Sequence, residues 1–152
     1  MTRITSVLLL AAALVGLGTV TSGQSSKSYR SRLSPVPMTT AMASTIAGVG
    51  SVTALLTGSR LTVTGTFEGL RSPATLAKLH KGKPGIRGPA ILDLKVTPGA
   101  NGGTSGTISG TLDLTPQQVA DLDQKWLYVQ LYSEKAPDGN LWGWLFPQEK
   151  GR

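Results

Sequence analysis

The sequence has no cysteine and a single histidine among its 152 residues. Without cysteine the chain can form no disulfide, no thiolate nucleophile and no metal site with sulfur ligands. With His80 as the sole imidazole, a zinc or copper site built on three histidines cannot form, so we expect no metal ion and no other cofactor. The folded domain must therefore be stabilised by packing alone.

Acidic residues are also scarce, since 8 Asp and Glu stand against 15 Lys and Arg, for a net charge of +7. The carboxylates are scattered, with Asp121 and Asp123 in a predicted helix and Asp138 in a predicted turn, so no pair is evidently placed for acid and base catalysis. No serine lies in a nucleophile-elbow pattern, and His80 has no evident carboxylate partner. We therefore expect a protein that is not an enzyme.

Residues 1–23 have the pattern of a signal peptide. Arg3 precedes an apolar run over residues 7–17, and small residues follow. The run is shorter than the roughly 20 apolar residues that span a bilayer, so we predict cleavage near Ser22 or Gly23 and no stable membrane span afterwards. An uncleaved membrane anchor is the alternative. The mature chain is expected to be secreted or periplasmic and to form one domain.

Residues 24–32 are rich in serine, lysine and arginine and have few apolar side chains. We expect a flexible leader there, because such a segment cannot bury enough surface to offset its ordering entropy. From residue 51 to residue 67, apolar and polar residues alternate on either side of a turn at 57–60, which predicts a β-hairpin with one buried face. The same reasoning predicts further strands over residues 74–80, 90–96 and 105–114, with loops at 81–89 and 99–103.

One short helix interrupts the predicted strands. Thr115 is suited to the N-cap, Pro116 to the first helical position, and Gln118 completes a capping box. Together these elements predict an all-β domain of about seven or eight strands with one short helix, arranged as an immunoglobulin-like β-sandwich or a barrel.

The last predicted hairpin pairs residues 126–133 with residues 140–146 across a loop at 137–139. Its leucine and valine side chains form the inner face, and because strand side chains alternate, aromatic residues share the other face. These aromatic residues are Trp126, Tyr128, Tyr132, Trp142 and Trp144. Rigid aromatic planes bind sugar rings or protein partners well. Alternatively, the aromatic face is ordinary packing under a loop, the leader or a second protomer.

A second candidate binding feature is a basic cluster around the loop at residues 81–89. Its members are Lys78, His80, Lys81, Lys83 and Arg87. The backbone N–H groups of this glycine-rich loop would add to an anion site. The alternative is a solvated charged surface. For an exported protein, an acidic envelope polysaccharide is a better candidate partner than nucleic acid, and a protein partner is also open.

The order of these features resembles the CHRD domain, a module named for chordin and found widely in exported bacterial proteins. The similar segments are residues 34–37, 77–80, 82–89, 106–112, 114–122, 128–133 and 139–145. The resemblance implies an immunoglobulin-like or related β fold and very little about activity. It places a CHRD-like domain at residues 33–147, followed by a C-terminal tail at 148–152.

The chain departs from the family pattern at its histidines. The family tends to have two histidines two residues apart in one strand and a third in a later strand, where this sequence has Lys78, His80 and Tyr132. Metal binding is therefore disfavoured, and His80 alone is expected at the surface or at the edge of a loop. In the last strand, Trp142 and Trp144 stand where the family has polar residues.

The sequence therefore predicts an exported CHRD-like binding or structural module with no chemistry of its own and an unidentified ligand. The main alternative is a protein that binds carbohydrate or an acidic envelope polymer through the aromatic face and the basic loop. A further alternative is a metal-dependent enzyme whose fold resembles that of a copper–zinc dismutase.

Overall fold

The computed structural model describes residues 23–149. The predicted signal peptide lies outside the described residues apart from Gly23, as do residues 150–152 of the predicted tail. The elements, in chain order, are β1 (Ser26–Pro35), the short 3-10 helix η1 (Thr40–Ser44), β2 (Val49–Thr57), β3 (Arg60–Glu68), β4 (Ala74–Lys81), β5 (Ala90–Pro98), β6 (Gly106–Asp113), α1 (Pro116–Asp123), β7 (Leu127–Ser133), β8 (Ala136–Trp144) and β9 (Phe146–Pro147).

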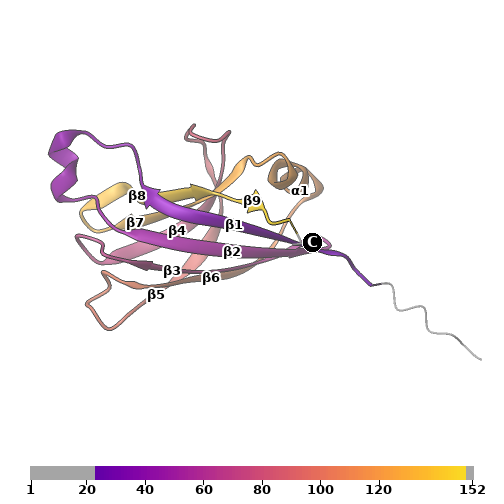
Figure 1. Ribbon diagram of the computed structural model, residues 1–152, viewed down its shortest axis with the longest axis horizontal. Helices are drawn as coiled ribbons and strands as arrows, with labels where there is room; N and C mark the ends of the chain where they lie inside the picture. Colours follow the sequence, from indigo (N-terminus) through magenta and orange to yellow (C-terminus); the bar gives the residue numbers. More distant parts are fainter. Residues whose placement is uncertain (1–22, 150–152) are drawn as a thin grey trace, which may run out of the picture.

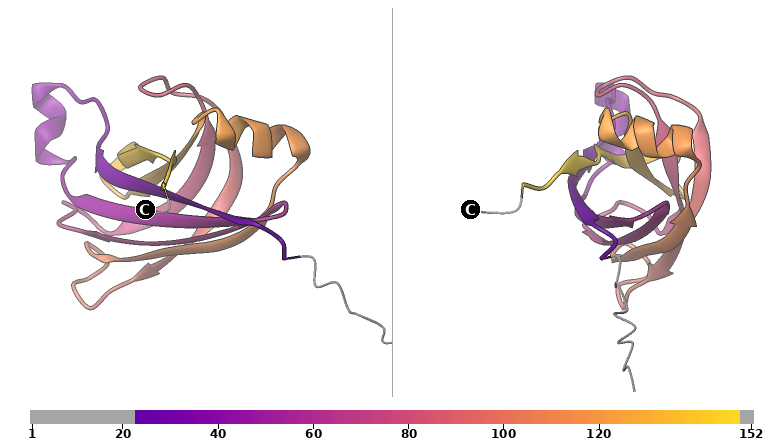
Figure 2. Two further views of the ribbon diagram at one scale, coloured as in Figure 1. Left: turned by 45° about the vertical axis from the view of Figure 1, so that its right-hand side comes forward. Right: turned by 90° about the vertical axis from the view of Figure 1, so that its right-hand side faces the viewer.

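Strands β1 to β8 form a closed antiparallel barrel in the order β2-β3-β6-β5-β4-β7-β8-β1, and β1 completes the ring by pairing with β2. β9 adds a short pairing to β1. In Figure 1, η1 lies at one end of the barrel and α1 at the other, and Figure 2 shows the ring of strands with α1 across its end. The predicted all-β fold with one short helix is confirmed as a barrel, whereas the immunoglobulin-like sandwich is not confirmed. Closure leaves few strand edges open to other chains.

The barrel core consists of strand residues at alternate positions, as the period of two predicts. In β2 the buried side chains are Val52, Ala54 and Leu56, and the side chains between them face outward. β2 and β3 pair with Thr57 opposite Arg60, so the predicted hairpin and its turn are confirmed. The core therefore fills the inside of the ring.

The residues at 24–32 are not the flexible leader that their composition suggested. Most of them belong to β1, in which Tyr29 and Leu33 are buried while Arg30 and Arg32 face outward. β1 pairs with β2 along most of its length and with β8 at its end. The prediction was wrong because the average composition of a segment hides the burial of alternate residues on one face.

Helix α1 begins as predicted. The Gln118 backbone N–H donates to the Thr115 hydroxyl at 3.2 Å, and the Thr115 N–H donates to Gln118 Oε1 at 2.9 Å, which completes the capping box. Leu122 is fully buried and Val119 packs against the barrel core, so α1 covers one end of the barrel. Within residues 23–149, no helix has both the length and the apolar character needed to cross a membrane.

The last hairpin is tighter than the sequence predicts. The chain turns at Glu134 and Lys135, and residues 136–139 belong to β8 rather than to a loop. The β7–β8 register shifts at this point, and Gly139 adopts a φ of 127°. The proline and glycine that suggested a loop are instead accommodated by an irregularity of the strand, which is where such residues are tolerated in sheets.

Candidate functional site

The β7–β8 hairpin is buried on both of its faces. Its leucine side chains enter the barrel core, and Tyr128, Trp142 and Trp144 form a second apolar cluster on the outside of the barrel. The segment between β1 and β2 covers this cluster through Val36 and Ile46. Trp142 and Trp144 are only 9% and 8% exposed. These values favour packing under a loop over an open aromatic docking surface.

The remaining two aromatic residues of the predicted face lie at its margin. Trp126 is half-buried, and the Lys83 ammonium lies 5.6 Å from the centre of its indole ring. Tyr132 is also half-buried, and its hydroxyl lies 2.7 Å from His80 Nε2. Tyr132 thus joins the aromatic cluster to the basic loop.

His80 lies near the end of β4, at the edge of the loop, which is one of the two positions expected from the sequence, but its side chain is buried rather than at the surface. Its Nδ1 donates to the Gly88 carbonyl oxygen at 2.9 Å, because a carbonyl can only accept. Burial lowers the pKa of His80 and so favours the neutral imidazole, in which Nε2 accepts the proton of the Tyr132 hydroxyl. Tyr128 stacks on the imidazole with 4.9 Å between ring centres. The neighbouring rings and hydrogen bonds therefore fix the orientation of the imidazole.

Two glycines hold the loop between β4 and β5 against the aromatic cluster. The Gly82 carbonyl accepts from Trp144 Nε1 at 2.8 Å, and the Gly88 N–H donates to the Tyr128 hydroxyl at 3.0 Å. A Cβ atom on Gly88 would overlap the Lys81 carbonyl oxygen, so no larger residue fits there. The N–H groups of both glycines have acceptors within the protein, and the predicted backbone contribution to an anion site is not found at them.

The structure does not gather the basic cluster into a single anion site. The Lys78 ammonium lies 2.9 Å from an Asp93 carboxylate oxygen, and the Lys81 ammonium lies 2.8 Å from Asp121. Lys83 is placed over the indole described above. Three of the five predicted residues are thus engaged away from His80.

Arg87 extends toward His80 and borders a pocket of ≈ 480 Å³ beside it. Its Nη1 donates to the Asp138 carbonyl oxygen at 3.1 Å, and its guanidinium lies 5.9 Å from the centre of the Trp142 indole. Arg87 forms no ion pair with any described carboxylate. We call this hollow the His80 pocket. Its side chains include Met42, His80, Arg87, Gln130, Tyr132 and Asp138.

Gln130 lies at the base of the His80 pocket and was not singled out from the sequence. It is 3% exposed, and its Nε2 donates to the Asp138 carbonyl oxygen at 3.2 Å. Its Oε1 is buried and has no hydrogen-bond donor within the described part of the chain. A buried acceptor of this kind is normally satisfied by water or a ligand.

The His80 pocket offers hydrogen-bonding groups but no acid and base pair. Asp138 is the one carboxylate residue that lines it, and burial raises the pKa of Tyr132. Among residues 23–149, no three His, Cys, Asp or Glu side chains lie close enough to hold a metal ion. The arrangement is suited to holding a polar ligand by hydrogen bonds.

Comparison with known proteins identifies the family of this domain. The sequence profile of the CHRD domain matches residues 25–145. The chain belongs to the CHRD domain family. No curated protein and no solved structure matches the chain. The matched region of this CHRD domain begins just before β1 and ends after β8, so it includes residues 26–32 of β1, which had been predicted to be a leader outside the domain.

The barrel of this CHRD domain brings together the aromatic face and the basic loop, which are separate in the sequence. β4 lies beside β7 with His80 opposite Tyr128, and the β4–β5 loop then returns over the same surface. Tyr132 and Arg87 reach His80 from the aromatic face and from the basic loop, respectively. The pairing of β4 with β7 spans about fifty residues of chain, and local periodicity does not reveal such a pairing.

Proposed function

We propose that this CHRD domain is an exported, non-catalytic binding module and that the His80 pocket is its ligand site. Export is supported by the signal-peptide pattern of residues 1–23 and by the occurrence of CHRD domains in exported proteins. N-terminal sequencing of the protein recovered outside the cytoplasm tests this part of the proposal. The expected first residue is Gly23 or Gln24, and a full-length chain held in the membrane would contradict it.

The convergence of hydrogen-bond donors and acceptors beside an aromatic ring is the observation that carries the proposal. Arg87 retains N–H donors beyond the one bound to the Asp138 carbonyl, and Gln130 Oε1 supplies a buried acceptor that has no donor within the described part of the chain. The half-buried Tyr132 ring also lines the pocket. Paired donors and acceptors beside an aromatic body match the hydroxyl groups and the apolar face of a sugar ring. We therefore propose a carbohydrate unit as the ligand.

The hydrogen bonds of the His80 imidazole support a binding role rather than a catalytic one. Both imidazole nitrogens are engaged, one by the Gly88 carbonyl and one by the Tyr132 hydroxyl. A general base needs a free nitrogen within reach of the proton that it removes. With one carboxylate beside it, the pocket also lacks the second group that glycoside hydrolysis requires.

Glycan-array screening of the mature protein, followed by calorimetry on the hits, tests the ligand. In the Arg87→Gln variant we expect roughly tenfold weaker binding or worse, because a charged donor is lost. In Tyr132→Phe we expect a smaller loss. Arg71→Gln is the matched control, since Arg71 is exposed on the connection between β3 and β4. The absence of any glycan hit, or hits whose affinity is the same in all three variants, would overturn the proposal.

A further inference from the structure

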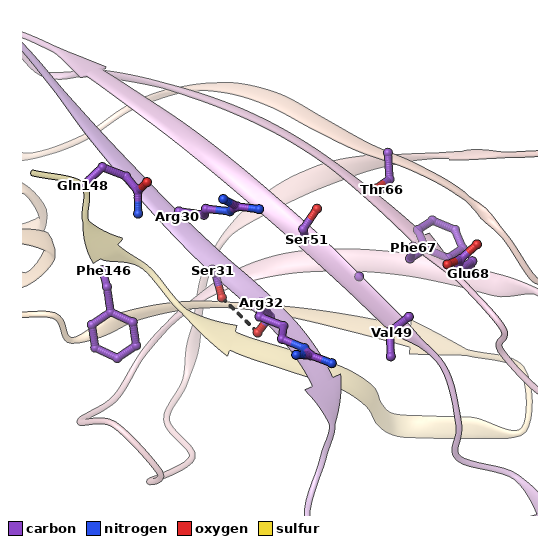
Figure 3. A pocket seen from close by; sticks show the side chains of 11 residues that line it. Arg30, Ser31, Arg32, Val49, Ser51, Thr66, Phe67, Glu68, Phe146 and Gln148 are labelled. Atoms are coloured by element: carbon purple, nitrogen blue, oxygen red, sulfur yellow. Dashed lines mark hydrogen bonds between the residues drawn. The ribbon is translucent and has the colours of Figure 1, made fainter. Parts of the chain in front are cut away.

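A second hollow lies on the outer face of β1, β2 and β3, away from the strands that line the His80 pocket. Its volume is ≈ 670 Å³, and Figure 3 shows the side chains around it. We call it the Arg30–Arg32 groove. The residues used in the argument are Arg30, Arg32, Ser51, Thr66, Glu68 and Phe146.

Two guanidinium groups lie on the same side of β1 in this groove. Arg30 and Arg32 alternate with buried residues, so both side chains point outward, about 6.6 Å apart along the strand. Figure 3 shows them extending from β1 in the direction of β2, Arg30 toward Ser51 and Arg32 toward Val49. Neither arginine forms an ion pair with a described carboxylate. The groove therefore presents two cations whose donors are available to a ligand.

Apolar surface accompanies these charges. Phe146 is 45% exposed and lies in β9, opposite Arg30 in the pairing with β1. Val49 is 43% exposed at the start of β2. The hydroxyl groups of Ser51 and Thr66, which face each other across β2 and β3, lie between these apolar groups. An aromatic ring, two hydroxyl groups and two arginines thus line one hollow.

We propose that the Arg30–Arg32 groove binds an acidic polysaccharide, with the guanidinium groups on successive carboxylates of the chain. The planar fork of arginine matches a carboxylate with two parallel hydrogen bonds. The Ser51 and Thr66 hydroxyls bond sugar hydroxyls, and the Phe146 ring packs against the apolar face of a sugar. This site shares no lining residue with the His80 pocket.

The groove favours a polysaccharide over an acidic peptide or a lipid surface. At residues 29 and 30, β1 is paired with β2 on one side and with β9 on the other, so its backbone has no free edge there to which a peptide strand could add. Recognition must therefore come from side chains. The site is also a hollow, and a flat layer of lipid headgroups contacts the rim of a hollow rather than the groups inside it.

Glu68 allows a second test, in which a substitution should strengthen ligand binding rather than weaken it. It borders the groove from the end of β3, in register with Val49 of β2, and forms no ion pair within residues 23–149. Its carboxylate repels an acidic ligand. Replacing Glu68 by glutamine should therefore tighten the binding that replacement of the arginines weakens.

The experiment measures binding of the mature protein to polygalacturonate, with dextran, polyglutamate and phosphatidylglycerol vesicles as comparison probes. We expect polygalacturonate to be preferred, the Arg30→Gln/Arg32→Gln variant to bind at least about tenfold more weakly, and Glu68→Gln to bind about twofold more tightly. The matched charge control is Arg71→Gln/Lys95→Gln, in which both altered residues are exposed elsewhere. It should retain binding.

Several outcomes would overturn the inference. Equal losses of polygalacturonate binding in the two double variants would show that the binding depends only on the net charge of the protein. Preference for polyglutamate or for vesicles would assign the groove to an acidic peptide or a lipid surface, and no binding to polygalacturonate would remove the proposed ligand. Because the altered arginines face outward, the double variant should keep the wild-type melting temperature, which shows that any loss of binding is local.

Discussion

The Lys81 ammonium lies 2.8 Å from the Asp121 carboxylate, and Asp121 is almost completely buried. Gln117 donates a further hydrogen bond to the same carboxylate at 3.1 Å. Lys81 ends β4 at the start of the loop that borders the His80 pocket, and Asp121 belongs to α1 at the end of the barrel. The ion pair therefore ties the helix that covers the barrel to the base of the candidate site.

We expect Lys81→Met to destabilise the protein by about 2–3 kcal/mol, because it leaves a buried carboxylate without its cation. This expected loss of stability is smaller than for a fully buried ion pair, because the Lys81 side chain is partly exposed. Urea unfolding measures the change. Lys78→Met is the matched control, because its partner Asp93 is mostly exposed and the expected loss is below about 1 kcal/mol. Equal losses in the two variants would contradict the prediction.

Asp123 gives the barrel a stability that depends on pH. Hydrogen bonds from the Tyr29 hydroxyl, at 2.7 Å, and from the Lys27 ammonium lower the pKa of Asp123. Because the folded pKa lies below the unfolded value, the stabilisation is present above about pH 4 and is lost as the pH falls through the folded pKa.

Asp123→Asn should therefore lose less stability than the wild type between about pH 4 and pH 2. Chemical denaturation at several pH values in this range measures the difference. Asp113→Asn is the control, since Asp113 forms an exposed pair with Arg60. Parallel stability curves for the wild type and Asp123→Asn would contradict the prediction.

His80 is the one histidine of the chain, so its titration can be followed by NMR without assignment of other imidazoles. Burial lowers its pKa, and we expect the ring to titrate below the ordinary value of about 6.5. The unfolded chain then binds a proton at a higher pH than the folded chain, so stability falls as the pH drops from about 6.5 toward the folded pKa.

In Tyr132→Phe, the neutral imidazole loses the hydroxyl that donates to Nε2, and the pKa of His80 should rise toward its ordinary value. A pKa that is unchanged or lower in this variant would contradict the hydrogen-bond direction assigned here. Thr75→Val, at an exposed position of β4, is the control and should leave the pKa unchanged.

Gly88→Ala should detach the β4–β5 loop from the aromatic cluster. The added Cβ would overlap the Lys81 carbonyl oxygen, which belongs to the backbone and cannot turn aside. We expect a loss of about 2 kcal/mol or more, measured by thermal unfolding, with a weakened near-ultraviolet CD signal from the tryptophans. Gly85→Asn is the control in the same loop, because Gly85 has open space around it and asparagine tolerates its positive φ. Similar losses in both variants would contradict the argument.

The parts of the fold that sequence alone predicts are those fixed by local patterns. The alternation in β2 and β3 predicted a hairpin, and Thr115 and Gln118 predicted the start of α1. β1 was missed because the charged residues on its outer face dominated its composition. For the same reason Arg30 and Arg32 were not considered as site residues, although a test for a period of two across this segment would have revealed them.

The burial of the aromatic face could not be predicted from local patterns. Alternation places Trp142 and Trp144 together on one face of β8, but it does not say what covers that face. The cover is the irregular segment between β1 and β2, which reaches the cluster through Val36 and Ile46. Such contacts depend on tertiary packing between segments distant in sequence, and a segment without periodicity carries no signal for them.

The ring closes between β1 and strands from the far end of the chain, since β1 pairs with both β8 and β9. Partners so distant in sequence meet later than neighbouring hairpins do, because a long loop must be ordered first. A nascent chain therefore remains without a finished domain until its C-terminal residues have been synthesised. If residues 1–23 act as the export signal proposed above, that interval leaves time for secretion to begin before the domain is complete.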